Sequence, residues 1–260
     1  MTSNIPAESG ATAPPTAGAV ILNLGCGTKV SGHANVMNID WSISVRIRRN
    51  PILRRCARLI MDSDRYEVYS ALSDNILVYD LARGIPYESD SVDAVFHSHL
   101  FEHLDRDVGR RFVTEVRRVL KPGGVHRVVV PDLEIVRRRY LDDLDQCQHD
   151  PEHSIQHDNF IEAMIGQCVW REAPGTSLRR PLRRRIENAL LGDARKRGQT
   201  HQWMYDRVSL ASLLASAGFR QISLRRYNES AIPNWESYGL EVTATGEEYK
   251  PMSLYVEAIK

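Results

Sequence analysis

One short segment constrains the fold of this chain more than any other: an apolar run that ends in a glycine-rich turn. Residues 19–24 (AVILNL) are followed directly by Gly25, Cys26 and Gly27. A short apolar run of this kind is typical of a strand buried on both faces in a parallel sheet. Glycines after such a strand permit a tight turn and let a ligand approach the backbone, because they carry no Cβ. Many strands end in glycine for conformational reasons alone, so the turn needs support from other segments.

Further strands and helices follow in the alternation that a doubly wound α/β sheet requires. The predicted strands cover residues 19–24, 36–40, 76–81, 91–96, 125–130, 221–224 and 253–259. Only residues 28–35 separate the glycine turn from the second strand, so we expect an abbreviated first crossover. Helices are predicted at 107–120, which stops at Lys-Pro-Gly-Gly, and at 206–217, which stops at Gly218.

Composition predicts a tail, one domain and a long insertion. Residues 1–18 are rich in Ala, Thr, Pro, Ser and Gly, so we expect a disordered tail. Residues 19–260 are expected to form a single domain, in which 135–200 is a helical insertion that covers the acceptor. A helix is expected to begin near Asp150-Pro151. The insertion carries three regularly spaced histidines, for which a solvated helix face is favoured over metal ligation: His149, His153 and His157.

The charge balance gives no global field that would draw the whole protein onto nucleic acid or an anionic membrane. The chain has 34 Lys and Arg against 33 Asp and Glu. Residues 179–197 contain eight basic residues without interleaved aromatics, which favours a surface segment over an RNA footprint. The four cysteines show no zinc spacing and fit reduced thiols. With no export signal and no apolar run near about 18 residues, we expect a cytoplasmic protein without a membrane span.

Two of the predicted strands end in a carboxylate. Asp40 ends the second strand and Asp80 lies in the third, near its end. In an open α/β sheet, ligands bind beyond the carboxyl ends of the strands. The first acid suits ribose hydroxyls, and the second can accept a hydrogen bond from an adenine amino group. Either aspartate alone could cap a turn, but both together, after a glycine turn, indicate a nucleoside site.

These segments resemble the successive motifs of class I S-adenosylmethionine-dependent methyltransferases, specifically the small bacterial kind with a shortened first crossover. The resemblance is carried by LNLGCGTKV, VMNIDW, VYDLARGIPYESDSVDAVFHSHLFEHL and EVRRVLKPGGVHRVVVPDLE. It covers roughly residues 19–134 and resumes at 201–219 and 250–260. It implies a Rossmann-like, doubly wound, seven-stranded sheet with a helical insertion after strand five, and S-adenosyl-L-methionine as the cofactor.

The resemblance also implies which residues hold the cofactor. The expected set is Gly25, Cys26, Gly27, Asp40, Trp41, Asp80, Leu81, His97 and Ser98. By the resemblance, the glycine turn packs along the methionine and ribose portions, and Asp40 holds the ribose hydroxyls. Trp41 would lie against adenine, while Asp80 with Leu81 would receive the adenine edge. The two residues after strand four would line the methionine end.

Two positions depart from the family pattern. Asn23 stands where an acid is usual, two residues before the first glycine, and Lys29 stands where a third glycine is usual. The first departure leaves open how the amino group of the methionine portion is held.

Residues 99–103 (HLFEH) match the HxxEH pattern of an inverted zinc-protease motif. The spacing would place both histidines on one helical face, as zinc requires. The resembling enzymes commonly carry SxxLEH-like residues here without zinc, so we do not expect zinc hydrolysis. His103 is interpreted as structural, and His99 as facing the reacting methyl group.

Residues 200–206 (THQWMYD) combine an imidazole with two aromatic rings. Aromatic walls with a few polar groups suit a sugar-like acceptor, although packing of the insertion onto the sheet is an equal alternative. Because a similar motif recurs in the resembling enzymes, Trp203, Tyr205 and Asp132 are the predicted acceptor-binding residues. A hydroxyl acceptor needs a general base, for which His201 is predicted, with His99 as the alternative.

The acceptor class rests on a narrower resemblance. THQWMYD and residues 250–258 resemble methyltransferases linked to saccharide assembly, including the methylmannose-polysaccharide O-methyltransferases. We therefore expect a saccharide or glycoconjugate acceptor and a role in polysaccharide biosynthesis. Asp132 and Glu134 could add a divalent metal such as magnesium. An RNA-modifying enzyme that uses 179–197 and a non-catalytic cofactor-binding partner subunit are the alternatives, and homo-oligomer formation is left open.

Overall fold

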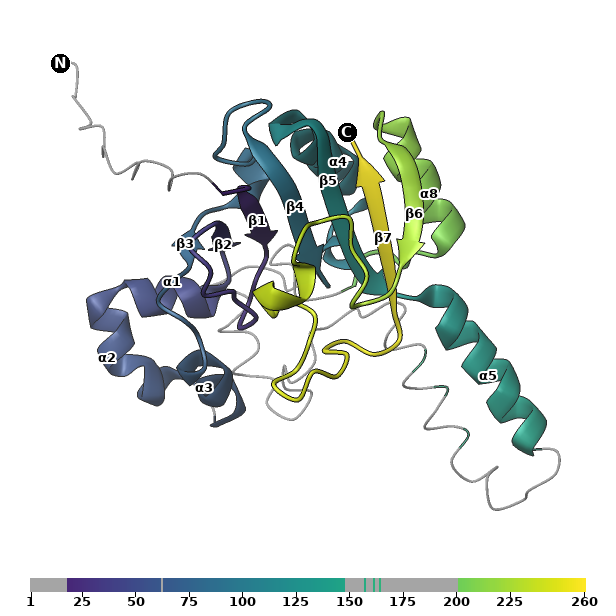
Figure 1. Cartoon of the computed structure of the whole chain (residues 1–260). Coiled ribbons are helices and arrows are strands. Elements are labelled where there is room, and N and C mark those ends of the chain that lie inside the picture. Colours follow the sequence, from purple (N-terminus) through teal and green to yellow (C-terminus); the bar gives the residue numbers. More distant parts are fainter. Residues whose placement is uncertain (1–17, 62, 148–156, 158–160, 162–163, 165–200) are drawn as a thin grey trace.

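The computed structural model describes residues 18–61, 63–147, 157, 161, 164 and 201–260. Seven strands form one sheet in the order β3-β2-β1-β4-β5-β7-β6 (Figure 1). Strand β7 pairs antiparallel with both β5 and β6, and the other four pairs are parallel. The strands are β1 (Ile21–Leu24), β2 (Val36–Asp40), β3 (Leu77–Val78), β4 (Val92–Ser98), β5 (Leu120–Pro131), β6 (Arg220–Arg225) and β7 (Ser253–Ile259). This order confirms the predicted Rossmann-like sheet.

One face of the sheet is covered by two helices. Helix α4 (Arg106–Val119) and helix α8 (Arg207–Ser216) enclose the larger apolar core with residues of β1, β4 and β5. Asp206 caps α8, because its side chain accepts the N–H groups of residues 208 and 209. Gly218, at a φ of +90°, lies just beyond the end of α8, as predicted. None of the helices in the described part of the chain is long and apolar enough to cross a membrane.

The other face is covered by a segment with little regular structure, residues 226–250, which we call the strap. In Figure 1 the strap crosses in front of the sheet while α4 lies behind it. Trp235 and Leu240 of the strap are buried against Phe96 of β4 and Val129 of β5. The strap contains only the short 3₁₀ helix η3 (Trp235–Tyr238). The strap matters for function because its C-terminal part lies beside the glycine turn.

A buried arginine ties the strap to the sheet. Arg127 of β5 has no exposed surface and donates to Glu241 of the strap at 2.6 Å and to Glu257 of β7 at 2.7 Å. Its guanidinium also donates to three carbonyl oxygens within residues 226–229. Trp235 donates its indole N–H to the same Glu241 carboxylate at 2.7 Å. All the guanidinium nitrogens therefore have acceptors, as a buried cation requires.

The segment between β2 and β3 holds three helices that the sequence analysis did not predict. They are α1 (Ile43–Arg49), α2 (Pro51–Ile60) and α3 (Ser63–Ser70). A local signal was present, because Asn50 accepts the N–H groups of residues 52 and 53 and Pro51 occupies the first helical position. As expected, the first crossover, residues 25–35, contains no helix.

Strands β3, β4 and β5 differ most from their predicted boundaries. Strand β3 is only two residues long, because Asp80 instead caps the 3₁₀ helix η1 (Leu81–Arg83). Strand β4 continues to Ser98, past the predicted end at 96. Strand β5 begins at Leu120, because that residue already pairs with Val92 before the register shifts.

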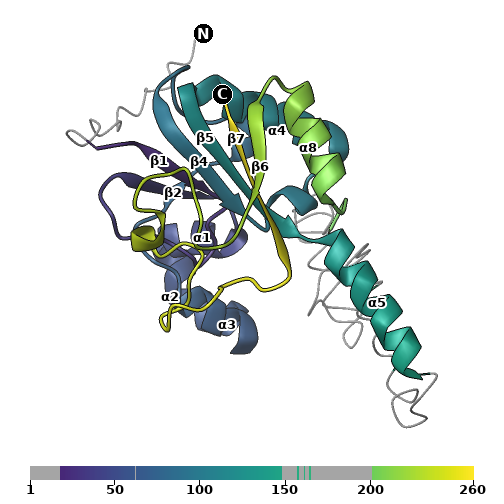
Figure 2. The ribbon, with the colours of Figure 1, turned by 45° about the vertical axis from the view of Figure 1, so that its right-hand side comes forward.

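The predicted insertion begins with helix α5 (Leu133–Cys147), which extends away from the sheet (Figure 2). The expected helix start at Asp150-Pro151, the basic stretch at 179–197 and the tail up to residue 17 lie outside the described residues.

Candidate active site

The turn after β1 has the backbone conformation that its glycines suggest. Gly25 and Gly27 have φ angles of +63° and +53°, in the left-handed region that favours glycine. The N–H groups of Gly25 and Cys26 both donate to the carbonyl oxygen of Ile39, at 2.8 and 3.2 Å. A Cβ on Gly25 would lie 2.9 Å from the Leu100 side chain, whereas a Cβ on Gly27 would meet nothing within 4 Å. The turn is therefore fixed to β2 and open above Gly27.

Asp40, at the end of β2, is buried against this turn. Its Oδ2 accepts the N–H of Gly27 at 2.8 Å, and its Oδ1 accepts the N–H of Ser42 at 2.6 Å. A carboxylate offers about four lone-pair positions, so two remain for further donors such as ribose hydroxyls. Asp40 therefore holds the turn and can still accept hydrogen bonds from ribose hydroxyls, the role predicted for it.

Asn23, the first departure from the family pattern, braces the turn from below. Its side-chain amide donates to the carbonyl of Lys29 at 2.9 Å and to the side chain of Asn38 at 3.0 Å. Asn38 in turn accepts from and donates to the backbone of Ser31. This buried network of amide side chains lies where the family usually has an acidic residue. It holds the first crossover, residues 25–35, in place without a helix.

Lys29, the second departure, points its charge toward the cavity beside the turn. Its Nζ donates to the carbonyl of Val242 in the strap at 2.6 Å and lies 4.4 Å from the centre of the Tyr249 ring. Burial lowers its pKa from the ordinary value. The sequence analysis noted Lys29 only as an irregularity, but its position makes it a candidate partner for an anionic group.

A cavity of about 200 Å³ lies where β1, β4 and the strap meet, and we call it the methionine-end cavity. It is lined by Asn23, Gly25, Cys26, Gly27, Thr28, Lys29, Phe96, Ser98, His99, Leu240, Tyr249 and Lys250. The glycine turn, the end of β4 and the strap therefore share one cavity, as expected for a ligand site beyond the carboxyl ends of parallel strands.

The prediction that His97 lines this cavity is wrong. Successive side chains of a strand point to opposite faces, so Phe96 and Ser98 face the cavity while His97 faces α4. His97 has no exposed surface, and its Nε2 lies 3.0 Å from Nε2 of His126. Burial lowers the pKa of His97 to about 3. His97 is a neutral core residue.

The residues expected at the adenine end lie at the carboxyl ends of β2 and β3. Trp41 is 41% exposed and lies under the guanidinium of Arg46, which is 4.6 Å from the centre of its ring. Asp80 accepts the N–H of Ala82 at 3.0 Å through one oxygen. Leu81 lines a second hollow, of about 440 Å³. Contact of these residues with adenine remains a prediction.

His99 has an unusual backbone conformation at the end of β4. Its φ is +51°, which is uncommon for a residue with a Cβ and is often found at functional sites. Its Nε2 lies 2.8 Å from Oγ of Ser253, and its Nδ1 lies 3.4 Å from Oε1 of Glu102. Burial, with the nearby charge of Lys250, lowers its pKa to about 3. An imidazole in its neutral form therefore lines the methionine-end cavity.

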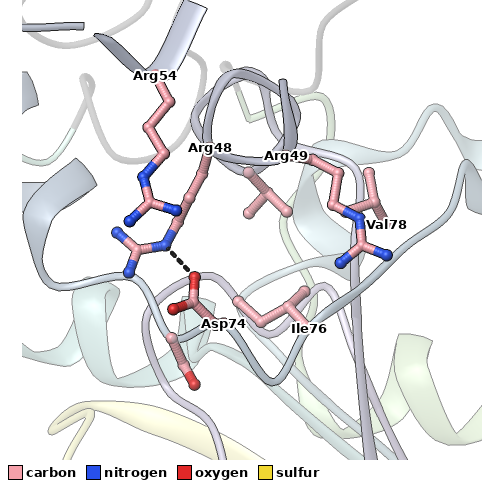
Figure 3. Close-up of a pocket in the computed structure, with 8 residues that line it drawn as sticks. Arg48, Arg49, Arg54, Asp74, Ile76 and Val78 are labelled. Carbon is pink, nitrogen blue, oxygen red and sulfur yellow. Dashed lines mark hydrogen bonds and ion pairs between the residues drawn. The ribbon is translucent and has the colours of Figure 1, made fainter. Parts of the chain in front are cut away.

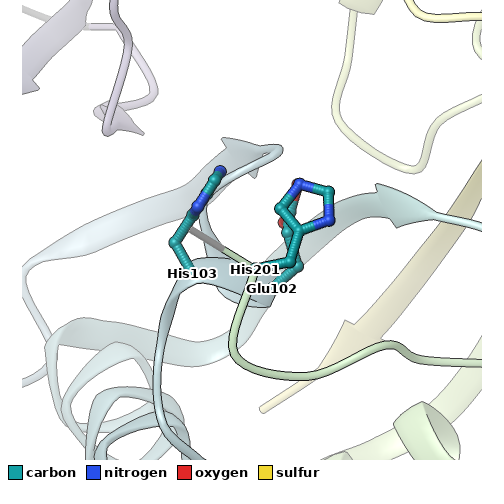
Figure 4. A group of neighbouring side chains, drawn as sticks. All are labelled: Glu102, His103 and His201. Carbon is teal, nitrogen blue, oxygen red and sulfur yellow. The ribbon is translucent and has the colours of Figure 1, made fainter. Parts of the chain in front are cut away.

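His201 lies close to the same carboxylate but does not line that cavity. Its ring packs edge-on against His103 with ring centres 4.9 Å apart, and the potential ligand atoms of Glu102, His103 and His201 lie within 4.8 Å of one another (Figure 4). The carbonyl oxygen of Glu102 accepts the N–H groups of Gln202 and Trp203, at 2.7 and 3.2 Å. The two predicted base candidates, His99 and His201, thus both lie beside Glu102, which the sequence analysis noted only within the HxxEH pattern.

The predicted acceptor residues do not lie together at the methionine-end cavity. Tyr205 is buried and stacks on Phe101 with ring centres 4.9 Å apart, and burial raises its pKa to about 12. Asp132 pairs with Tyr205 through an isolated backbone bridge. Trp203 is 39% exposed beneath the guanidinium of Arg106, and together with Tyr205 it lines a separate hollow of about 520 Å³ near α8. Trp203 and Tyr205 thus share a hollow, but one outside the methionine-end cavity.

The carboxylate pair suggested for magnesium is engaged elsewhere. Glu134 is bound by Arg138 at 2.8 Å and by Arg207 at 3.2 Å. Asp132 accepts the N–H of Glu134. This arrangement gives no support to a magnesium site at these residues. Of the three insertion histidines only His157 is described, and its Nδ1 lies 2.5 Å from Asp143.

A further hollow of about 360 Å³ is lined by three arginines at α1 and α2 (Figure 3). Arg48 donates to Asp74 at 2.8 Å, which holds the pKa of that carboxyl below its ordinary value, while Arg49 and Arg54 complete the basic rim. This hollow shares no residue with the methionine-end cavity, so we do not include it in the active site.

Comparison with known families agrees with the fold. Residues 22–128 match the family model described as a methyltransferase domain. The matched segment spans β1 to most of β5 and contains the glycine turn, Asp40, Asp80 and His99. Residues 22–128 thus match a methyltransferase domain, and the strand order agrees with the class I methyltransferase fold predicted from the sequence. Comparison with curated proteins gives no match.

Solved structures resemble this chain only distantly. A SAM-dependent methyltransferase from Methanosarcina mazei is 18% identical, with 92% of this chain and 91% of that chain covered, at a TM-score of 0.41. One from Archaeoglobus fulgidus is 12% identical over 93% and 86% of the two chains, at 0.42. A Haloferax volcanii putative methyltransferase, solved with the Trm112 activator, is 16% identical over 93% and 82%, at 0.38.

Proposed function

We propose that this enzyme transfers the methyl group of S-adenosylmethionine to a hydroxyl group of a saccharide or glycoconjugate, in cytoplasmic polysaccharide biosynthesis. The observation that carries the proposal is that the His99 imidazole lines the cavity beside the glycine turn. A hydroxyl must lose its proton as it attacks the methyl group, and a positioned histidine is the most common group for that step. The charge balance of the chain gives no general attraction to RNA.

The cofactor would bind with its methionine portion in the methionine-end cavity. Asp40 would hold the ribose hydroxyls through the lone pairs that Gly27 and Ser42 leave open. Lys29, which lines the cavity with a charged amine, would face the carboxylate of the methionine portion. Trp41, Asp80 and Leu81 would surround adenine, as the resemblance implies.

Of the two candidate bases, His99 is the better supported for direct contact with the acceptor. It lines the cavity, and Glu102 lies at 3.4 Å from its Nδ1, a position from which a carboxylate can orient an imidazole. His201 also lies beside this carboxylate but does not line the cavity, and it would contact an acceptor that enters from the side of residues 201–203.

Substitution of the two histidines tests this proposal. We expect His99→Ala to lower kcat by about 100-fold or more, the usual contribution of a general base. Affinity for S-adenosylhomocysteine should change by only a few fold, because the cofactor contacts remain. Turnover can be measured as S-adenosylhomocysteine released with a panel of saccharide acceptors, with calorimetry for the cofactor. His33→Ala, an exposed histidine of the first crossover, is the matched control.

Three outcomes would contradict the proposal. Near-normal turnover in both His99→Ala and His201→Ala would remove the histidines as bases. Methylation of RNA with steep salt dependence, and none of saccharides, would favour the RNA-modifying alternative. Tight cofactor binding with no turnover on any hydroxyl would indicate the non-catalytic partner subunit.

A further inference from the structure

Three side chains that commonly bind metals converge beside the active site. Glu102 and His103 belong to the 3₁₀ helix η2 (Phe101–His103), and His201 comes from the segment that precedes α8. Their potential ligand atoms all lie within 4.8 Å of one another, and Figure 4 shows the three side chains arriving from these two segments. The convergence was not visible in the sequence, because His201 is distant along the chain.

The Glu102 carboxylate is the least satisfied group in this cluster. Its side chain has no exposed surface, and neither of its oxygens has a hydrogen-bond partner. The Nδ1 of His99, which the site holds in its neutral form, lies 3.4 Å from Oε1 of Glu102. A buried carboxylate without compensation costs several kcal/mol, in order of magnitude, so such a group calls for a partner.

We propose that Glu102, His103 and His201 bind one divalent transition-metal ion, with zinc as the ion that best suits the donor set. Two imidazole nitrogens and one carboxylate oxygen are a common zinc set when a further position stays open for water or substrate. Magnesium is a poorer match, because it prefers oxygen ligands throughout.

This site differs from the one that the HxxEH pattern suggests. That pattern would pair His99 with His103, but Nε2 of His99 is taken up by Ser253 at 2.8 Å. His201 takes the place of His99 in the ligand set. The backbone holds it there, because the carbonyl of Glu102 accepts the N–H groups of Gln202 and Trp203. The ligands are thus brought together before any ion binds.

The ion would add chemistry to the proposed reaction without being required by it. A metal with an open position lowers the pKa of a bound water or hydroxyl. At this place, next to His99 and the methionine-end cavity, such an ion would polarise an acceptor hydroxyl. Metal binding can be measured without acceptor or cofactor, so a failure of the saccharide proposal leaves the test of this site intact.

Calorimetric titration of zinc into the full-length protein, without a histidine tag and stripped by a chelator, tests the site. We expect one zinc per chain. Glu102→Gln, His103→Ala and His201→Ala should each weaken binding by more than about 100-fold, beyond the loss typical of groups that only orient a ligand. His33→Ala should bind as the parent does. Magnesium should give no comparable heat.

A second described group, Asp143, Cys147 and His157, also places potential ligands within 4.8 Å and supplies the decisive control. His157→Ala should leave zinc binding unchanged. Cobalt substituted for zinc should show no thiolate charge-transfer band, because the proposed ligands contain no sulfur. Circular dichroism of metal-free Glu102→Gln should show a folded protein, since glutamine keeps the shape of the side chain.

Three outcomes would overturn the site: no zinc binding by the folded parent, parent-like affinity in folded Glu102→Gln, or a cobalt thiolate band that disappears in His157→Ala.

Discussion

At the scale of single residues, the backbone at the ends of β1 and β4 is more unusual than the side chains there. Gly25 and His99 both have positive φ angles, of +63° and +51°. Each follows directly on a strand and lines the methionine-end cavity. Such conformations cost of order 1–3 kcal/mol in residues with a Cβ and persist where the surrounding structure holds them. The turn after β1 avoids this conformational cost because Gly25 has no Cβ. His99, at the end of β4, has a Cβ and bears the cost.

Substitution of Gly25 should damage cofactor binding and stability together. In Gly25→Ala the left-handed conformation would cost about 1–2 kcal/mol, and the new Cβ would lie 2.9 Å from Leu100. We expect a lower melting temperature and weaker binding of S-adenosylhomocysteine by calorimetry. Gly32→Ala is the matched control, because its Cβ would meet nothing within 4 Å. Equal behaviour of the two variants would show that the Gly25 turn tolerates a side chain.

The sequence predicted the residues of the turn well and the face of β4 poorly. Gly25, Gly27 and Asp40 lie together because a glycine turn and an acid at a strand end leave local patterns in the chain. His97 was assigned to the wrong face, since a strand buried on both sides shows a continuous apolar run that does not reveal which side chains point where. Lys29 had no pattern to mark it as a cavity residue.

At the scale of elements, the strap is the feature that no periodicity could predict. Residues 226–250 contain one short 3₁₀ helix, yet they cover a face of the sheet and contribute to the methionine-end cavity. Their position depends on long-range contacts with Arg127, a buried charged residue of strand β5. Among helices α1 to α3, Asn50-Pro51 marks the start of α2 in the sequence, whereas Ser42 before α1 makes no capping hydrogen bond.

Removal of the Arg127 guanidinium should destabilise the protein by about 3–5 kcal/mol, because Glu241 and Glu257 would be left buried without their cation. We expect Arg127→Met to lower the free energy of unfolding by this amount in urea titrations. It should also weaken cofactor binding, since the strap supplies Tyr249 to the cavity. Arg220→Met, at an exposed arginine of β6, should change stability by less than about 0.5 kcal/mol. Two superimposable unfolding curves would contradict the anchoring role.

At the scale of the whole molecule, the core contains a pair of neutral histidines that couples stability to pH. His97 and His126 have no exposed surface, and their ring neighbours are Phe101, Phe112 and Phe219. Burial lowers the pKa of His97 to about 3 and that of His126 well below its ordinary value. In the unfolded chain both would titrate near about 6.5, so the unfolded state binds more protons below that pH.

The stability supplied by this pair should therefore be complete above about pH 6.5 and be lost progressively as the pH falls toward 3. We expect the free energy of unfolding, measured in urea at a series of pH values, to fall between pH 6.5 and 4.5. The double variant His97→Leu/His126→Leu should show a shallower slope in this range. His33→Ala should keep the parent slope. An unchanged slope in the double variant would assign the acid sensitivity to other groups.

The architecture as a whole was predictable from the order of motifs, because strands that alternate with helices and end in ligand-binding residues permit few topologies. The position of β7 between β5 and β6 was not predicted, since an antiparallel strand with an apolar pattern pairs equally well at a sheet edge.

That position has a consequence for biosynthesis. During translation, the ribosome completes β5 and β6 before residues 253–259 emerge, yet these residues fill the gap between them. Until then the nascent chain exposes two unpaired strand edges, which are templates for association with other chains. Polypeptides that stall before Ser253 keep both edges open and should depend on chaperones, however well their cofactor turn has formed.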